Sequence, residues 1–222
     1  MQHRGQDRNP EPLMNRLRSP GEGHDLMTRH PNPRVAAARV DALFIDRWSP
    51  RSFSPEPLTE ADIASMFEAA RWAPSSSNVQ PWLFLYETDG PDREVFDSIL
   101  KPRNREWAAK APFLGFLFAN TRTADGREPR TAQFDAGAAW MSLALQAQAL
   151  GIYTHGMAGI DVDAAHERLG VDTELWTVMC AFAAGRIGPP EALPPALRER
   201  ERPKDDRKAL GEIAHRGKWR SS

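Results

Sequence analysis

Two arginines flank a serine in the segment RWSPRSF, which begins at Arg47. Pro50 disfavours a helical conformation at Ser49, so we expect this segment to be extended. Residues i, i+2 and i+4 of an extended chain point to the same side, which places Arg47, Ser49 and Arg51 together. Two guanidinium groups beside a hydroxyl can grip a phosphate group through charged hydrogen bonds. Two surface arginines beside a helix-capping serine would show the same spacing.

A second polar segment, APSSSNVQPW, occupies residues 73–82 between a predicted helix and a predicted strand. Asn78 and Gln80 each carry donor and acceptor atoms, which suit the edge of a heterocyclic ring. Loops at such junctions commonly carry binding groups. The alternative is a plain turn, in which the Ser and Asn side chains satisfy the local backbone.

Small residues form a third segment, Gly156-Met157-Ala158-Gly159. They let the backbone approach a planar ligand closely and direct its N–H groups at it. Ordinary helix–strand links look similar, so this segment alone decides nothing. Its spacing matches neither G-x-G-x-x-G nor the P-loop, and no Rossmann or Walker site is predicted.

The other reactive side chains do not form a catalytic set. Cys180 lies within an apolar strand pattern, where we expect a packed thiol rather than a nucleophile. His155, Asp161 and His166 lack the spacing of a metal-binding helix, so no metal site is predicted. The serines before Asn78 lack the G-x-S-x-G pattern of a serine hydrolase.

The composition limits the class of protein. The chain has 222 residues, of which 41% are hydrophobic and 27% are charged, and its formal net charge is −1. These values predict a soluble globular protein with no nucleic acid and no membrane as partner. The sequence has no apolar run of bilayer length and no secretory leader pattern. Its single cysteine excludes an internal disulfide, and we expect a cytoplasmic location.

The spacing of apolar residues predicts the elements that position these segments. A helix from residue 60 is expected to begin at the capping residue Thr59 and to stop before Pro74. Further helices are expected over residues 35–47, 95–100 and 131–150, with a short one capped by Asp161. Apolar runs predict strands over residues 82–86, 113–119 and 175–185, whereas THGMAGID is expected to be a loop.

The helix predicted over 131–150 carries Phe134, Ala138, Met141 and Leu145 on one side and is apolar around much of its circumference. Such a helix is either buried at the centre of a fold or placed at an interface. The strands are few and widely separated, which predicts an α+β domain over residues 34–222. Residues 1–33, rich in Pro, Gly and charged side chains, are expected to form a flexible N-terminal extension.

Taken in order, the segments RWSPR, APSSSNVQPW, QALGIYTHGMAGID and RKALGEIAHRGKW resemble the nitroreductase family of FMN-dependent oxidoreductases. The resemblance covers about residues 35–219. It implies an α+β nitroreductase-like fold with a central, mostly antiparallel sheet flanked by helices. It also implies an intertwined homodimer with FMN at the subunit interface, with the helix over 131–150 as the candidate dimer core.

The resemblance assigns cofactor-binding roles to residues from all four segments. Those for the FMN phosphate and ribityl chain would be Arg47, Ser49 and Arg51, with backbone contact from Trp48 and closure by Arg207 or Lys208. Those for the isoalloxazine would be Asn78 and Gln80 at its polar rim and Met157, Ala158 and Gly159 along the ring, with an N–H near Ala158 directed at N5. Ala209 and Gly211 depart from the Pro and Glu that are usual in the C-terminal segment.

The implied activity is ping-pong transfer of hydride from NAD(P)H through FMN to a nitroaromatic compound, a quinone or a similar small-molecule acceptor. No catalytic residue on the protein is required, because the flavin carries the hydride. One alternative is a flavin-dependent dehydrogenase, dehalogenase or flavin-consuming relative on the same fold. Another is a non-enzymatic flavin-binding redox sensor whose partner docks on residues 1–33.

Overall fold

A single four-stranded sheet organises the chain. The computed structural model describes residues 32–123 and 126–219. The strands follow the order β1-β2-β4-β3, and each is antiparallel to its neighbours. Their bounds are Trp82–Glu87 (β1), Phe113–Asn120 (β2), Tyr153–Met157 (β3) and Trp176–Gly185 (β4). The predicted α+β class and antiparallel sheet are therefore confirmed.

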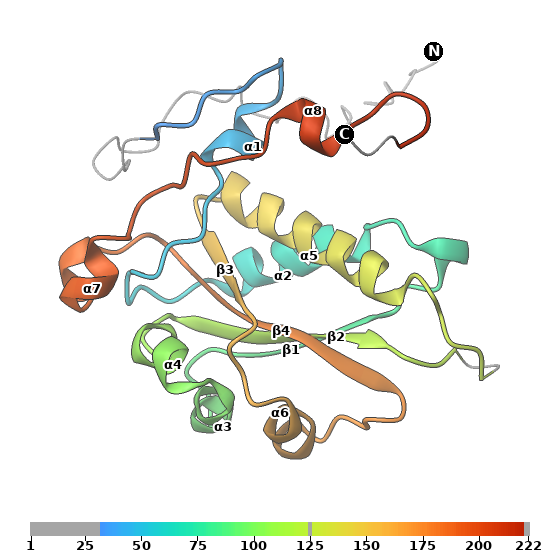
Figure 1. The fold of residues 1–222 in the computed structure, drawn as a ribbon. Helices are drawn as coiled ribbons and strands as arrows, with labels where there is room; N and C mark the ends of the chain where they lie inside the picture. Colours follow the sequence, from blue (N-terminus) through green and yellow to red (C-terminus); the bar gives the residue numbers. More distant parts are fainter. Residues whose placement is uncertain (1–31, 124–125, 220–222) are drawn as a thin grey trace, which may run out of the picture.

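Helices cover both faces of this sheet (Figure 1). On one face, α2 (Glu60–Arg71) and α5 (Ala132–Ala149) share a core cluster with Phe113 and Phe182. On the other face lie α3 (Arg93–Ile99), α4 (Pro102–Ala108) and α6 (Val162–Leu169). Strand β2 is buried along nearly its whole length because both of its faces are covered.

Local chemistry sets the helix boundaries. The Thr59 hydroxyl accepts the Asp62 N–H at 3.1 Å and caps α2, as the sequence predicts. Asp161 caps α6 by accepting the Ala164 N–H at 3.0 Å. Gly170 ends α6 in the left-handed conformation, with a φ of 67°, which a glycine adopts at little cost.

The helix predicted over residues 35–47 is wrong for most of its length. Only α1 (Ala42–Asp46) is helical, because the Asp41 side chain caps the chain at that point. Val40 and Phe44, which the prediction placed on an apolar face, are 46% and 49% exposed. Without a surface to pack against, that apolar spacing does not stabilise a longer helix.

The segment THGMAGID was predicted to be a loop, and this is wrong for its first half. Strand β3 ends at Met157 and pairs along its five residues with β4. An edge strand this short, with a glycine inside it, has no alternating apolar pattern that would reveal it. Helix α4 likewise has no counterpart among the predicted helices.

The two ends of the described chain meet above α5. Beyond β4 come the short helices α7 (Pro195–Arg198) and α8 (Leu210–Ile213), and α8 lies beside α1 (Figure 1). Arg34 ties these ends together, because its Nε donates to the Lys204 carbonyl at 2.6 Å and its Nη1 to the Ile45 carbonyl at 3.0 Å. Residues 1–31 of the predicted extension lie outside the described residues, so the boundary at residue 33 stays a prediction. Within the described ranges, no helix is long and apolar enough to span a membrane.

Candidate functional site

The segment that begins at Arg47 is fixed against the chain that follows β4. Residues 52–54 pair with residues 186–188 through a β-bridge and backbone hydrogen bonds. Glu201 has a fully buried side chain, and its Oε1 accepts the N–H groups of Arg51 and Ser52 at 2.7 and 2.8 Å. The extended conformation of the arginine segment, which its local sequence predicts, is therefore also held by a residue 150 positions away.

Arg47 and Ser49 lie on the same side of the segment, as predicted, with 3.5 Å between Arg47 Nη1 and Ser49 Oγ. Arg51 has a partner that the spacing did not reveal. Its Nη1 lies 4.0 Å from Glu201 Oε2, and this buried oxygen accepts no hydrogen bond from the residues that the structure describes. Trp48 turns its side chain into the core, where it meets Tyr153 edge-on.

Guanidinium groups from both ends of the domain converge. Burial and the nearby charge of Arg207 lower the pKa of Arg47. Burial and the charges of Arg207 and Arg47 also lower the pKa of Arg34, although two nearby carboxylates oppose this. Like charges held together in this way would be stabilised by an anion between them. Lys208, the alternative predicted for the phosphate, has an exposed side chain next to Arg207.

His155 joins the arginine segment to β3. One of its ring nitrogens, Nδ1, lies 2.7 Å from the Pro50 carbonyl, and its ring lies 4.6 Å from that of Trp107 between centroids. Burial lowers the pKa of His155 to about 4, and the charges of Arg51 and Arg47 add to this effect. The ring is therefore neutral at pH 7, and Nδ1 carries the proton that it donates to the carbonyl.

The free energy of unfolding of His155→Gln is expected to fall less than that of the wild type when the pH is lowered. Because the folded-state pKa is about 4, the unfolded chain binds more protons between about pH 6.5 and pH 4, and the free energy of unfolding decreases as the pH falls through this window. The contribution of His155 to this decrease is about 2–3 kcal/mol at most. Urea unfolding at both ends of the window measures the decrease in each protein. An equal decrease in wild type and His155→Gln would contradict this prediction.

A turn of small residues follows β3. Met157 is buried at the end of the strand, and Ala158 is exposed. The Ile160 N–H closes the turn on the Ala158 carbonyl at 3.0 Å. The predicted small-residue loop is thus correct for Ala158 and Gly159, and the strand before it is joined to the arginine segment by His155.

The polar segment 73–82 contains a strained turn. Ser77, Asn78 and Gln80 have φ values of 51°, 56° and 53°, in the left-handed region that residues other than glycine rarely adopt. The buried Asp135 holds the turn by accepting the Ser76 N–H at 3.2 Å. Strain of this kind persists only where the surroundings impose it, and it concentrates at functional sites.

The structure does not bring this turn to the arginines within one chain. Asp135, which holds it, belongs to the first turn of α5, whereas β3 begins after the last turn of α5. In Figure 1 the turn lies at one end of α5 and the segment from Arg47 to Arg51 lies near the other. The predicted site residues therefore form two groups, with Asn78 and Gln80 separate from the rest.

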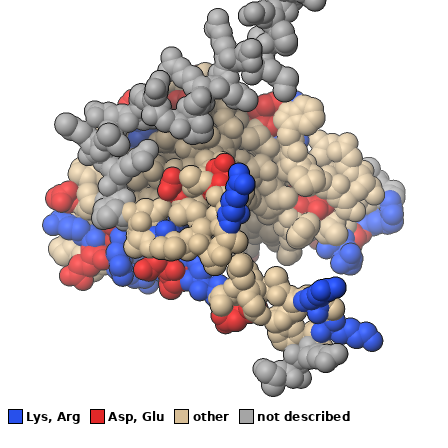
Figure 2. Space-filling view, turned by 90° about the horizontal axis from the view of Figure 1, so that it is seen from above, with Lys and Arg blue, Asp and Glu red and all other residues tan. Residues whose placement is uncertain are grey.

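Helix α5 is buried on one side only. Ala136, Ala139 and Leu143 face the sheet and α2, whereas Phe134 is 79% and Met141 36% exposed. Phe134 and Met141 thus mark the outer side of the helix, whereas Ala138, predicted on the same side, packs against the core. Seen from above, uncharged side chains cover much of the surface (Figure 2). Exposed large apolar side chains in a row are typical of an interaction surface.

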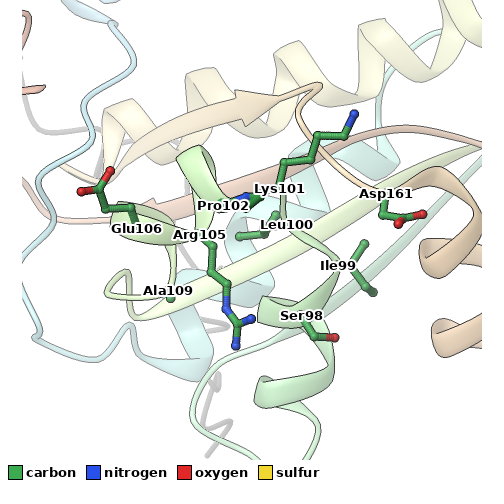
Figure 3. A pocket seen from close by; sticks show the side chains of 9 residues that line it. All are labelled: Ser98, Ile99, Leu100, Lys101, Pro102, Arg105, Glu106, Ala109 and Asp161. Atoms are coloured by element: carbon green, nitrogen blue, oxygen red, sulfur yellow. The ribbon is translucent and has the colours of Figure 1, made fainter.

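A cavity of about 670 Å³ lies between α3, α4 and the start of α6 (Figure 3). It carries both charges, with Lys101 and Arg105 opposed by Glu106 and Asp161. None of the predicted cofactor-binding residues lines it. Within a single chain, this cavity is therefore distinct from the group of arginines, whereas its lining residue Lys101 donates its N–H to the Gly159 carbonyl of the turn after β3.

Within residues 32–123 and 126–219, neither the cysteine nor the possible metal-binding side chains indicate a catalytic nucleophile or a metal site. Burial raises the pKa of Cys180 to about 11, so the thiol stays protonated and is a poor nucleophile. In the same ranges, no group of three or more His, Cys, Asp or Glu side chains could hold a metal ion.

Comparison with known protein families shows to which family the chain belongs. The model of the nitroreductase family matches residues 45–94 and 85–186, which include the arginine segment, the strained turn and the turn after β3. The chain belongs to the nitroreductase family. The predicted family is thereby confirmed, although the fourth segment, which begins at Arg207, lies beyond the matched residues.

Individual relatives of this nitroreductase-family chain differ in how much they share. A solved structure described as an oxidoreductase containing FMN is 38% identical, has a TM-score of 0.81 and covers 88% of this chain and 100% of its own. The 5,6-dimethylbenzimidazole synthase of Rhodospirillum rubrum is 27% identical in an alignment of 171 positions that covers 66% of this chain and 81% of that protein. A Streptomyces coelicolor protein, named provisionally as an NADH dehydrogenase/NAD(P)H nitroreductase, is 35% identical over 92 residues. That match spans 41% of this chain and only 46% of the relative.

Three side chains of this nitroreductase-family chain support the site through contacts that were not predicted from the sequence. Glu201 holds Arg51, His155 holds the Pro50 carbonyl, and Asn104 holds the turn after β3. They lie 150, 105 and 55 positions from the backbone that they bind. No local spacing joins such pairs, so the sequence carried no signal that would have revealed them.

Proposed function

We propose that this chain is an FMN-dependent oxidoreductase that passes hydride from NAD(P)H to an electron-poor small molecule, such as a nitroaromatic compound or a quinone, by a ping-pong mechanism. The observation that carries this proposal is the arginine segment, in which Arg47 lies beside Ser49 and which His155 joins to β3 through the Pro50 carbonyl. The charge of Arg207 lies near Arg47 as well. The 38% identity with an oxidoreductase that contains FMN supports the same cofactor.

The chemistry of the donor set fits FMN. A phosphate dianion between Arg47 and Arg207 would relieve their repulsion, and the Ser49 hydroxyl beside Arg47 adds a neutral donor. Arg51, with part of its charge offset by Glu201, suits the polar ribityl chain and the ring edge better than a second full phosphate contact. The exposed Ala158 leaves the backbone of its turn open to a flat ring.

FMN, when bound, would supply the hydride chemistry itself. The residues of this chain would bind and orient it. His155 is neutral at pH 7, and its Nδ1–H donates a hydrogen bond to the Pro50 carbonyl. It therefore fixes the arginine segment rather than donating a proton to a substrate. The buried Trp107 packs against the His155 ring and helps to hold it in this orientation.

A complete site would require two copies of the chain. Asn78 and Gln80 lie apart from the arginines within one chain, and the outer side of α5 is apolar and exposed. We therefore propose a homodimer that buries Phe134 and Met141 and brings the strained turn of one copy to the arginines of the other. The polar side chains of that turn would then face the ring edge at the subunit interface.

Anaerobic mixing of the flavin-loaded protein with NADH or NADPH tests the activity. We expect the flavin absorbance near 450 nm to bleach with at least one of them and to return when a nitroaromatic compound or a quinone is added. A flavin that neither nucleotide reduces would contradict the proposed electron donor.

A flavin-consuming reaction is the second candidate, because the benzimidazole synthase aligns over 81% of its length. Mass spectrometry of the flavin after aerobic turnover separates the two activities. Intact FMN supports the oxidoreductase, whereas loss of the flavin ring system supports the second candidate.

A further inference from the structure

The turn after β3 is fastened from its outer side by the junction of α3 and α4. Leu100 forms an antiparallel bridge with Ile160, and the Asp161 N–H donates to the Ile99 carbonyl at 2.9 Å. Figure 3 shows Ile99, Leu100 and Asp161 close together where these segments meet. These backbone contacts fix the position of the turn.

The Gly159 carbonyl accepts two further hydrogen bonds at this junction. One comes from the Lys101 N–H at 3.1 Å and the other from Asn104 Nδ2 at 3.0 Å. The backbone of Asn104 is itself held, because its N–H donates to the Lys101 carbonyl at 2.9 Å. Asn104 is therefore a side-chain donor on a fixed support, directed at the peptide plane that follows Gly159.

Gly159 and Asn104 also fit each other sterically. A Cβ added at Gly159 would lie 2.5 Å from Asn104 Nδ2, and its three nearest neighbours would all be atoms of the Asn104 side chain. The missing side chain thus points toward Asn104, on the outer side of the turn. The glycine lets the amide approach the backbone this closely, and a Cβ here would push the Asn104 amide aside.

We propose that Asn104 is a positioning residue that sets the orientation of the Ala158–Gly159 turn, and thereby of the backbone that would lie against the isoalloxazine. This inference rests on the proposed FMN-dependent function. The Ala158 carbonyl is already bound by the Ile160 N–H. The Gly159 carbonyl is the point at which a side chain holds the turn, and without Asn104 this carbonyl keeps the Lys101 N–H.

The variant Asn104→Asp tests this role, because it keeps the shape of the side chain and replaces the Nδ2 donor with an oxygen that repels the carbonyl. The matched control is Glu106→Gln, which neutralises an exposed side chain on the same helix. The first readout is amide hydrogen exchange of the peptide spanning residues 157–161 in the flavin-free protein. We expect exchange about five- to tenfold faster in Asn104→Asp, since one hydrogen bond is lost, and unchanged exchange in the control.

The flavin-loaded protein supplies the second readout. Asn104→Asp should bind FMN within about threefold of wild type, because the phosphate contacts are intact, while NAD(P)H reduces its flavin about five- to tenfold more slowly. A residue that only stabilises the fold would lower the unfolding temperature and leave the reduction rate at saturating FMN unchanged.

Gly159→Ala provides an independent route to the same change, because its Cβ would displace the Asn104 amide. Asn104→Ala and Gly159→Ala should each remove the same hydrogen bond, from Asn104 Nδ2 to the Gly159 carbonyl. The double variant Asn104→Ala/Gly159→Ala should then reduce its flavin no more slowly than the slower of these two single variants. Effects that add would overturn the proposal.

The outcomes separate this inference from the proposed function. Faster exchange together with slower flavin reduction supports the positioning role. Wild-type exchange in Asn104→Asp, or faster exchange with an unchanged reduction rate, overturns it and leaves the proposed function standing. Failure of wild type itself to bind FMN overturns the proposed function and this inference with it.

Discussion

Arg47→Ala should weaken FMN binding by about 10- to 150-fold, because a charge-assisted hydrogen bond contributes about 1.5–3 kcal/mol. The substitution also removes the repulsion between Arg47 and Arg207, so the folded protein itself should lose little stability. The ratio of flavin to protein after dialysis, followed by calorimetric titration with FMN, measures the effect.

Arg51→Ala should also lower FMN retention, but with a different signature. Glu201 would be left as a buried carboxylate without its cation, so the free energy of unfolding should fall as well, by about 1–3 kcal/mol. Arg39→Ala is the matched control, since this substitution removes the same charge from an exposed side chain. Wild-type retention of FMN in both Arg47→Ala and Arg51→Ala would contradict the assignment of Arg47 to the phosphate and of Arg51 to the ribityl chain and ring edge.

Phe134→Glu/Met141→Glu should separate the dimer and release the flavin, although every arginine is intact. Burial of an unpaired charge costs several kcal/mol, so the dimer dissociation constant should rise by at least about 100-fold. The monomer would then keep the arginines and lose the strained turn that the second copy supplies. Size-exclusion chromatography with light scattering, together with the flavin-to-protein ratio, measures both effects.

Val162→Glu is the matched control for this experiment. It places the same charge on an exposed apolar side chain of α6, away from the outer side of α5. A wild-type protein that is monomeric and still retains FMN would contradict the shared site. So would a double variant that remains dimeric.

The sequence could predict the elements with strong internal patterns. Thr59 caps α2 as expected, and the apolar runs of β1, β2 and β4 are strands within a residue or two of the predicted bounds. The side of α5 that carries Phe134 and Met141 could not be assigned from the sequence. Both sides of that helix are apolar, and only the packed sheet shows which one the chain buries itself.

The segments of the candidate site could be predicted from the sequence, whereas their positions relative to one another could not. Arg47 and Ser49 are neighbours by local geometry, and their contact is found. The buried Glu201 beneath Arg51, and the separation of Asn78 from the arginines, depend on contacts between distant parts of the chain. Such contacts follow from the tertiary packing, which no spacing within one segment encodes.

The most direct test of the central claim is an absorption spectrum of the purified protein during titration with FMN. The account predicts a yellow protein that takes up one FMN per chain, with two sites in each dimer. A folded sample that stays colourless and does not take up added FMN would contradict it.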